Sequence, residues 1–518
     1  MSSPTPTLVE SLTQSLSMLS STRKLSVHVL ETEARKTTSL YAHAAHHPKG
    51  VHLHDVMVML YIHLTPADLY VSPSPPPAAS AAPAAVPVEG VEVPSSAPPV
   101  ASTAASSSSS AIIHPVLLVA LEAQIYALPP LTSNSLPSLI LYISKVDTSG
   151  YPLPRSLSLP YARTLLTSVL SHHLALPSHS VFIHLFARAQ PQYLFPDSGE
   201  DRQEEFGEKG KKVVGGAGLC RWWKGVFESA VVDAGLGNAN GVERRVWIPE
   251  MNAEEAKPIL KTSTSVAGGQ AQTWGHDLKS LPTPLASDPA TLPMSLRIPT
   301  FSDDPKSRFL VDLTENTSSS APPPPPPSSA KTPDAIRDAA KSASDRARVR
   351  AEAALEALEG GEDEFWERLA FRQECSLGDT VAFFCVANVR SASAPTSISN
   401  TPATSSTTTT SEISSTVETM ESPAATGQVT KTLWQRLHAT LLNQAFSSAQ
   451  RIVDGSEVVW EAVRSLTPEK TMVGVEGIVE AVKGAVGGVK RAREDEVERK
   501  EPVVQVLGVR KKVKKVVA

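Results

Sequence analysis

The sequence is poor in cysteine and in long apolar runs, and each shortage excludes a class of protein. Its 518 residues include three cysteines, Cys220, Cys375 and Cys385, with no CxxC spacing. Such a set forms no paired disulfide framework and argues against a structural zinc site, so we expect a reducing compartment. No apolar run approaches the roughly 18 residues that a membrane helix needs, and the N-terminus lacks the layout of a secretion signal. We therefore expect a soluble intracellular protein that binds no membrane.

Several functional motifs are also missing. The formal net charge is −5, so bulk charge does not favour polyanion binding, and we expect no sequence-specific nucleic-acid binding. Neither a GxGxxG fingerprint after a strand, nor a P-loop, nor a GxSxG elbow is present. Histidines cluster between residues 43 and 63 without supporting carboxylates or thiolates, so we expect no metal site. Covalent catalysis has no support from these patterns.

Low-complexity tracts divide what remains. Tracts rich in Pro, Ala, Ser and Thr cover about 72–112, 315–332 and 391–428, and such compositions bury too little apolar surface to form a core. We therefore predict one domain over 1–484 with three disordered insertions, followed by a basic C-terminal tail over 485–518.

Ordered segments between these tracts alternate in type, which predicts a mixed α/β domain. Runs of β-branched, aromatic and other apolar residues predict strands at Val51–Leu64, from Val116, at Pro137–Ser144 and at Ser180–Ala189. Helical spacing predicts helices at Ser158–Leu174, with Ser158 as a possible cap, at Thr332–Leu358 and at Thr432–Ser447.

The stretch EKGKKVVGGAGLCRWW, Glu208–Trp223, places lysines and glycines before two tryptophans. A basic loop beside indole rings suits a phosphate-bearing, partly apolar ligand. The same composition also fits a disordered surface loop that leads into a core helix with two buried tryptophans. Both interpretations stay open on composition alone.

The stretch SDDPKSRFLVDL, Ser302–Leu313, surrounds a proline with two carboxylates and an amine. Asp304 can cap a helix that begins at Pro305, with Phe309, Leu310 and Leu313 as its buried face. Because Pro305 favours an extended backbone at Asp304, the side chains of Asp303 and Asp304 should point to opposite sides. The two carboxylates therefore should not share one role.

Six blocks follow one another along the chain: LEAQIYALP from Leu121, LYISKVDTSGY from Leu141, ARAQPQYLFPDS from Ala187, LCRWW from Leu219, IPTFSDDPKSRFLVDL from Ile298 and DEFWERLAFRQECSLGDTVAFF from Asp363. In this order they resemble one known family, the fungal histone acetyltransferases called regulator of Ty1 transposition proteins, which are structural relatives of the CREB-binding-protein acetyltransferases.

The resemblance implies a central mixed β-sheet surrounded by helices, the CREB-binding-protein-type acetyltransferase fold. It implies transfer of acetyl from acetyl-CoA, with no metal, to a lysine of histone H3. The implied partners are H3–H4 and histone chaperones, and the implied setting is the nucleus, with links to replication-coupled nucleosome assembly, the DNA damage response, DNA repair and transcription regulation.

The resemblance also implies roles for individual residues. Asp304 matches a catalytic aspartate with Asp303 beside it, Tyr193 and Trp223 line the substrate end, and Lys306 matches a lysine that acetylates itself. The positions implied to bind acetyl-CoA are Val146, Asp147, Thr148, Arg155, Ser156, Leu157, Ser158, Leu159, Phe186, Lys211, Lys212 and Trp222.

The tail carries two basic clusters, Lys490–Arg493 and Arg510–Lys515. Such runs favour nuclear import or a histone or chaperone contact, although a merely solvated tail has the same composition. Two other functions stay open: an inactive scaffold that binds histones or chaperones, and an acetyltransferase that acts on another protein. The sequence does not identify the target lysine, the chaperone, the role of the insertions or the oligomeric state.

Overall fold

The computed structural model describes most of the ordered blocks. The described residues are 5–70, 113–133, 135–199, 211, 213–237, 241–260, 273–278, 283–286, 288–318, 345–346, 348–372, 375, 379–390 and 427–480. The insertions predicted at about 72–112 and 391–428 and the tail at 485–518 lie almost wholly outside these ranges. Helix α7 (Pro305–Ser318) runs past the predicted start of the insertion at about 315.

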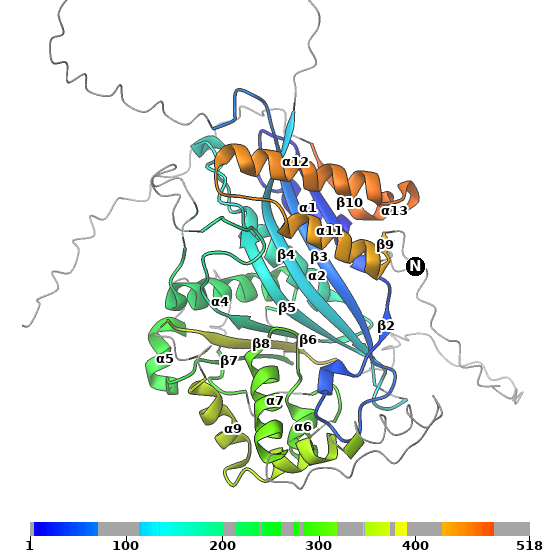
Figure 1. Ribbon diagram of the computed structural model, residues 1–518, viewed down its shortest axis with the longest axis vertical. Helices are drawn as coiled ribbons and strands as arrows, with labels where there is room; N and C mark the ends of the chain where they lie inside the picture. The colour runs from blue at the N-terminus through cyan, green and yellow to red at the C-terminus, as the bar shows by residue number, and fades with distance from the viewer. Residues whose placement is uncertain are drawn as a thin grey trace, which may run out of the picture.

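One mixed sheet organises the described chain (Figure 1). Its strand order is β10-β1-β3-β4-β5-β6-β8-β7, while β2 pairs with β3 and β9 pairs with β1. Most neighbours are antiparallel, whereas β5 and β6 are parallel, as are β1 and β9. The strands are β1 (Leu25–Thr32), β2 (Arg35–Lys36), β3 (His52–Leu64), β4 (His114–Leu128), β5 (Ser138–Thr148), β6 (Ser180–Ala187), β7 (Val242–Trp247), β8 (Ala382–Asn388), β9 (Gln428–Val429) and β10 (Glu476–Val479).

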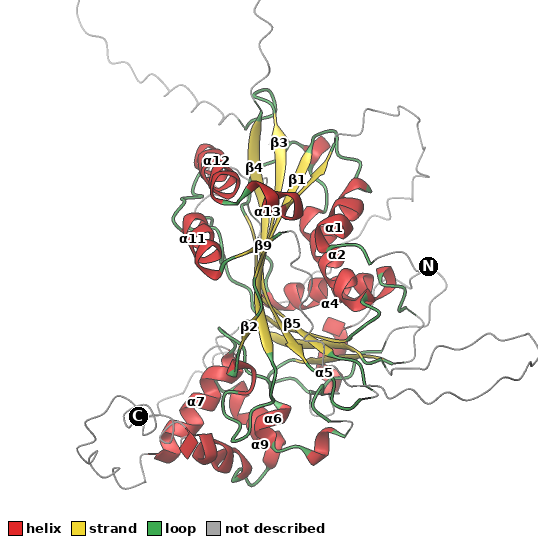
Figure 2. Cartoon of the chain, turned by 90° about the vertical axis from the view of Figure 1, so that its right-hand side faces the viewer, coloured by secondary structure: helices red, strands yellow, loops and turns green. Residues whose placement is uncertain are grey.

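Helices cover both faces of the sheet, which explains why its central strands are apolar on both sides. Figure 2 shows α11 (Lys431–Leu442) and α12 (Ala449–Leu466) on one face, and α1 (Leu8–Ser17), α2 (Tyr161–Ala175) and α4 (Gly216–Asp233) on the other. A further group gathers at one end of the molecule and comprises α6 (Met294–Arg297), α7 and α9 (Gly361–Ala370). Short α5 (Ala253–Leu260) and α13 (Glu469–Val475) complete the named α-helices.

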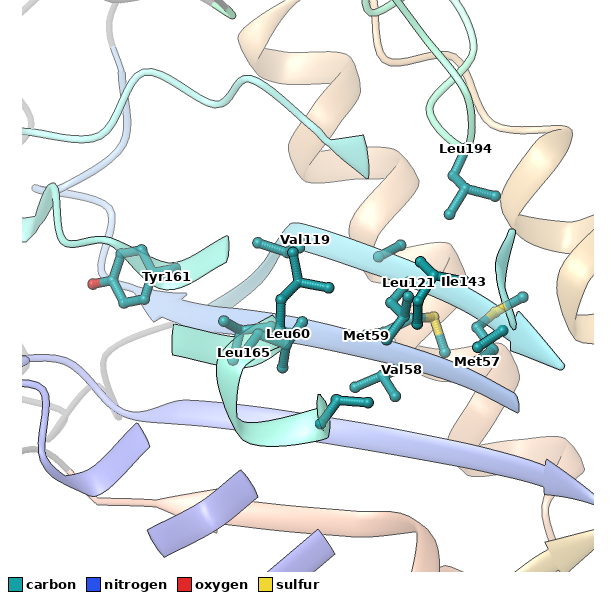
Figure 3. Packing of buried hydrophobic residues seen from close by; sticks show 14 of the residues in the cluster. Met57, Val58, Met59, Leu60, Val119, Leu121, Ile143, Tyr161, Leu165 and Leu194 are labelled. Atoms are coloured by element: carbon teal, nitrogen blue, oxygen red, sulfur yellow. The ribbon is translucent and has the colours of Figure 1, made fainter. Parts of the chain in front are cut away.

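The largest apolar core covers both faces of the sheet, and one of its layers lies between the sheet and α2. Figure 3 shows side chains of β3 and β4 meeting α2 and the loop at Leu194. Val58, Leu60 and Leu121 are 0% exposed, and so is Leu165 of α2. Fully burying a side chain of this size contributes roughly 1.5–3 kcal/mol each, so this layer holds the central strands in place beneath the site described below.

The predicted fold class, a mixed sheet surrounded by helices, is confirmed, and so are the four predicted strands. The predicted helix at 158–174 begins later, at Tyr161, and Ser158 does not cap it. Instead the Ser158 amide donates to the carbonyl of Arg155 and closes a 3-10 turn, Arg155–Leu157, while Pro160 occupies the cap position.

The helix predicted at 432–447 is observed as α11, and it buries Trp434, Leu437 and Leu441. Of the helix predicted at 332–358, residues 332–344 lie outside the described residues, and 345–346 and 348–356 are helical. Within the described part of the chain, no helix is both long and apolar enough to cross a membrane.

Candidate active site

A pocket of about 210 Å3 lies where the parallel strands β5 and β6 end. Residues 143–148 of β5 and 185–190 of β6 and its following loop form its base. Because parallel strands present their carboxyl ends at one edge, ligands commonly bind at such a place. The remaining walls come from α2, the loop at Tyr193 and the start of α4, through Ala162, Tyr193, Lys211, Val213, Val214, Leu219, Trp222 and Trp223.

Asp147 at the end of β5 holds one wall of the pocket together. One oxygen of its buried carboxylate accepts hydrogen bonds from the amides of Tyr193, Leu194 and Phe195 at 2.7, 2.9 and 3.2 Å. The other oxygen accepts from its neighbour's amide and from the Lys211 ammonium at 2.6 Å. Because the Asp147 carboxylate accepts hydrogen bonds from all of these donors, it fixes the positions of the turn at residues 193–195 and of the Lys211 side chain.

The two tryptophans of α4 are brought to the pocket by a close helix–strand approach. A Cβ on Gly216 would lie 1.9 Å from the carbonyl oxygen of Thr380, so only glycine fits at the first turn. Trp223 is 4% exposed and belongs to the core, whereas Trp222 is half-buried and faces the pocket. Their rings meet edge to face, with centroids 5.1 Å apart. Both indoles line the pocket, and Trp223 is also part of the core, so features of both interpretations are present.

A second hollow of about 360 Å3 adjoins the pocket. The two hollows share four lining residues, Thr148, Ala162, Lys211 and Trp222. The second hollow is otherwise formed by the β5–α2 connection and the start of α2, from Ser149 to Arg163, together with Leu118 and Val119 of β4. Shared walls make the two hollows one elongated binding region.

Most predicted coenzyme positions lie at these two hollows. The pocket includes Val146, Asp147, Thr148, Phe186, Lys211 and Trp222, and the second hollow includes Leu159. Arg155, Ser156 and Ser158 are exposed beside the second hollow without lining it, and Leu157 is buried. Lys212 lies outside the described residues. The ammonium of Lys211 is held by Asp147 and by the Ser198 hydroxyl at 2.9 Å.

Asp304 and Lys306 form a buried ion pair next to the pocket rather than on its surface. Asp304 is 0% exposed, and its Oδ2 lies 2.6 Å from the Lys306 Nζ. Its other oxygen accepts the Lys306 amide at 3.0 Å, which is the capping bond expected at the start of α7. The Lys306 ammonium lies over the rings of Phe301 and Phe383, 5.4 and 5.1 Å from their centroids. Capping and ion pairing thus coexist at Asp304.

The surroundings of this pair are apolar and uncharged. Burial, and then the Lys306 charge, lowers the pKa of His184 to about 3, so this imidazole is neutral at pH 7. Burial, and then the charges of Asp304 and Asp303, raises the pKa of Tyr142 well above its usual value. Burial raises the pKa of the Cys385 thiol to about 12. Asp304 and Lys306 are therefore each other's charge partners in a poorly solvated site.

Asp303 has the opposite environment to Asp304. Its backbone is left-handed (φ +63°), and its side chain is 55% exposed. The carboxylate lies 3.5 Å from the ammonium of Lys145, which lines the pocket and also contacts Glu122 at 3.1 Å. The two side chains thus lie in different environments, as predicted, although the backbone at Asp303 is left-handed. Their proposed catalytic roles remain predictions.

Tyr193 and three residues that sequence reasoning missed complete the pocket. The Tyr193 hydroxyl donates to the carbonyl of Arg188 at 2.6 Å, and burial raises its pKa to about 12, so the phenol stays neutral. Lys145, Arg188 and Gln190 also line the pocket. All three belong to the blocks SKVD and ARAQ, which lie at the ends of two predicted strands. Because ligands often bind at the ends of strands, this position could have marked the three residues as candidates for a binding site. Among the described residues, no group of three or more His, Cys, Asp or Glu side chains is placed to hold a metal ion.

Comparison with known proteins assigns this arrangement to a class. A family model described as the histone acetyltransferase KAT11-type domain matches residues 157–460. The chain is 26% identical over 289 residues to histone acetyltransferase rtt109 of Aspergillus flavus, covering 52% of this chain and 44% of that protein. It is 25% identical over 250 residues to histone acetyltransferase rtt109 of Schizosaccharomyces pombe, covering 47% and 51%. The chain thus spans about half the length of the curated relatives it matches.

A solved structure supports the fold independently. The crystal structure of Rtt109 from Aspergillus fumigatus is similar over 91% of this chain and 99% of that chain, with a TM-score of 0.54 and 17% sequence identity. By class, the fold is the mixed sheet with helices on both faces that this solved structure also has. Because the family model matches more than half of the sequence, the chain belongs to the KAT11-type histone acetyltransferase family.

Proposed function

We propose that this chain transfers an acetyl group from acetyl-CoA to a lysine side chain of histone H3. The observation that carries the proposal is the elongated region formed by two hollows that share Trp222, Thr148 and Lys211. A long, partly apolar co-substrate needs such a region, with an aromatic wall for its pantetheine arm. Trp222 supplies that wall, and Arg163 and Lys211 supply cationic side chains along it.

The chemistry requires positioning and one proton transfer. A lysine side chain has a pKa of about 10.4 in water, so its amine must lose a proton before it attacks the thioester carbonyl. The new C–N bond forms as the C–S bond breaks, and the departing sulfur carries the electron pair until it is protonated. The pocket contributes by holding the two reacting groups together and excluding water.

Asp303 is the better placed of the two aspartates to receive that proton through water. It is exposed and lies beside Lys145 of the pocket, whereas Asp304 is enclosed and paired with Lys306. We assign Asp304 the role of a positioning residue that starts α7 and holds Lys306. Acetylation of Lys306, which the family resemblance suggests, would remove the positive charge that balances Asp304.

The partners and the setting are further parts of the proposal. The resemblance suggests H3–H4 delivered by histone chaperones in the nucleus, during replication-coupled nucleosome assembly and the DNA damage response. The clusters Lys490–Arg493 and Arg510–Lys515 have the composition of nuclear import signals.

The test is acetyl transfer from labelled acetyl-CoA to H3–H4, with and without a histone chaperone, followed by mass mapping of labelled lysines that includes Lys306. Trp222→Ala should raise the KM for acetyl-CoA about tenfold, the equivalent of about 1.4 kcal/mol of lost ring contact. Val458→Ala on α12, an exposed apolar residue away from the pocket, is the control and should leave KM unchanged.

Two results would overturn the proposal. Histone binding without any transfer would identify the chain as an inactive histone or chaperone scaffold. Labelling of other proteins but not of H3 would show that the chain is an acetyltransferase, and would contradict the proposal that histone H3 is its substrate.

A further inference from the structure

A separate groove lies between the end of β7 and helix α9, away from the pocket at β5 and β6. One wall is the segment that leads from Trp247 to Glu255 of α5, and the other wall is α9 (Figure 1). The hollow has a volume of about 600 Å3 and ends at Phe371, whose side chain is 73% exposed. Nothing in the proposed acetyl transfer uses this groove.

Helix periodicity explains why α9 presents one continuous wall. Asp363, Trp366, Glu367 and Ala370 stand at positions i, i+3, i+4 and i+7, which share one face of a helix, and all four line the groove. The floor is aromatic, because the rings of Trp247 and Trp366 lie 5.0 Å apart at 58°. Tryptophan faces attract cations more strongly than other aromatic rings do.

The rim of the groove carries charge of one sign. Glu250, Glu255, Asp363 and Glu367 line it, and among its described lining residues none is lysine, arginine or histidine. The cations nearby on the two helices face other partners: Lys257 pairs with Glu254 at 2.5 Å. Arg368 pairs in the same way with Glu364. The groove therefore keeps its negative character.

Ring contacts connect this groove to the candidate active site. The Trp247 ring lies 5.5 Å from that of Phe383, which lies 4.6 Å from that of Phe186 in the wall of the pocket. Phe383 also carries the Lys306 ammonium above its face. Two ring contacts through the buried Phe383 therefore link the groove to the wall of the pocket inside the core.

We propose that this groove binds a lysine- and arginine-rich segment of the protein substrate, outside the acetylated lysine itself. The proposal rests on the proposed function for the identity of the substrate, and on charge complementarity and the indole floor for the site. Cationic side chains gain both from the carboxylates and from the rings, whereas neutral or acidic segments gain from neither.

The test measures binding of a fluorescent Lys/Arg-rich peptide to the full chain by anisotropy, without acetyl-CoA. The double variant Glu250→Gln, Glu367→Gln keeps side-chain size at two exposed positions and should weaken binding about fivefold at low salt. The matched control, Glu33→Gln with Glu461→Gln, removes the same charge from exposed sites outside the groove and should change binding less than twofold. Phe371→Ala should weaken binding severalfold without changing net charge.

The outcomes separate this proposal from the proposed function. If the two double variants weakened peptide binding equally, the effect would be one of overall charge, and the proposal that the groove binds the peptide would be wrong. Unchanged binding in the groove variant would contradict the proposal in the same way. Binding that persists in Trp222→Ala while acetyl transfer falls supports a groove that acts independently of the pocket. In a transfer assay the groove variant should raise the KM for the peptide and leave kcat unchanged, and a fall in kcat alone would contradict the proposal.

Discussion

Replacing Asp304 by asparagine should destabilise the protein even though asparagine still caps α7. Asparagine and aspartate are nearly equivalent as caps, so the loss comes from the buried ion pair. Lys306 is 7% exposed by its side chain, and its ammonium would remain in an apolar site without the carboxylate 2.6 Å away. Removing one partner of a buried pair costs about 3–5 kcal/mol, which is a large part of the 5–15 kcal/mol that stabilises a typical domain.

A double-mutant cycle gives the sharper measurement. Lys306→Met alone strands the Asp304 carboxylate and should also cost about 3–5 kcal/mol. The double variant Asp304→Asn, Lys306→Met strands no charge, so it should be less destabilised than the sum of the single variants by about 2 kcal/mol or more. Urea unfolding at pH 7 measures all four free energies.

The chain offers a matched control on the same helix. Asp312 pairs with Arg372 at 2.6 Å, but both side chains are at least 33% exposed. Asp312→Asn removes an exposed pair and should cost no more than about 1 kcal/mol. If Asp304→Asn proved as mild as Asp312→Asn, the reasoning from burial would be refuted. If Asp304→Asn folded normally and lost transfer, Asp304 would act directly in the chemistry rather than as a positioning residue.

Two further predictions concern the helix that carries the tryptophans and the response to acid. Gly216→Ala should lower the melting temperature and weaken acetyl-CoA binding, because its Cβ would overlap Thr380, whereas Gly215→Ala has open space and should do neither. Burial lowers the folded-state pKa of His172 and His184 to about 3, so between about pH 6.5 and pH 3 the unfolded state binds more protons and stability falls as the pH falls. Each histidine adds up to about 1.4 kcal/mol per pH unit to that slope, and chemical unfolding at pH 7, 6 and 5 should show a shallower decline in His172→Asn.

The local pattern of apolar residues was enough to predict where the long strands lie, but it could not predict the order in which the strands pair. β3 and β4 are long apolar runs that are predictable because both of their faces are buried. α1 was missed, although Thr7 and Glu10 form a capping box that the sequence displays. The pairing of β1 with β10 joins the two ends of the described chain and has no local signature.

The candidate site was predictable in position and less so in role. The glycine-to-tryptophan stretch left a ligand wall and a core helix open, and in the structure both of its indoles line the pocket while Trp223 is also buried in the core. The work of Asp147 depends on a turn at residues 193–195 that folds back onto β5, so no spacing rule could have revealed it. Lys306 likewise reads as a surface cation in the sequence, and only the rings of Phe301 and Phe383 enclose it.

Two adjacent aspartates lie in different environments because the backbone turns sharply between them. Asp303 adopts the left-handed region, which non-glycine residues rarely occupy, and Pro305 restricts the residue before it. The turn places Asp304 in an enclosed space beside the Lys306 ammonium, and leaves Asp303 exposed beside Lys145. Burial makes a carboxylate useful for holding structure, while solvent contact makes it able to exchange protons. The proposed division of roles, in which Asp304 positions the site and Asp303 receives the proton, follows from this turn.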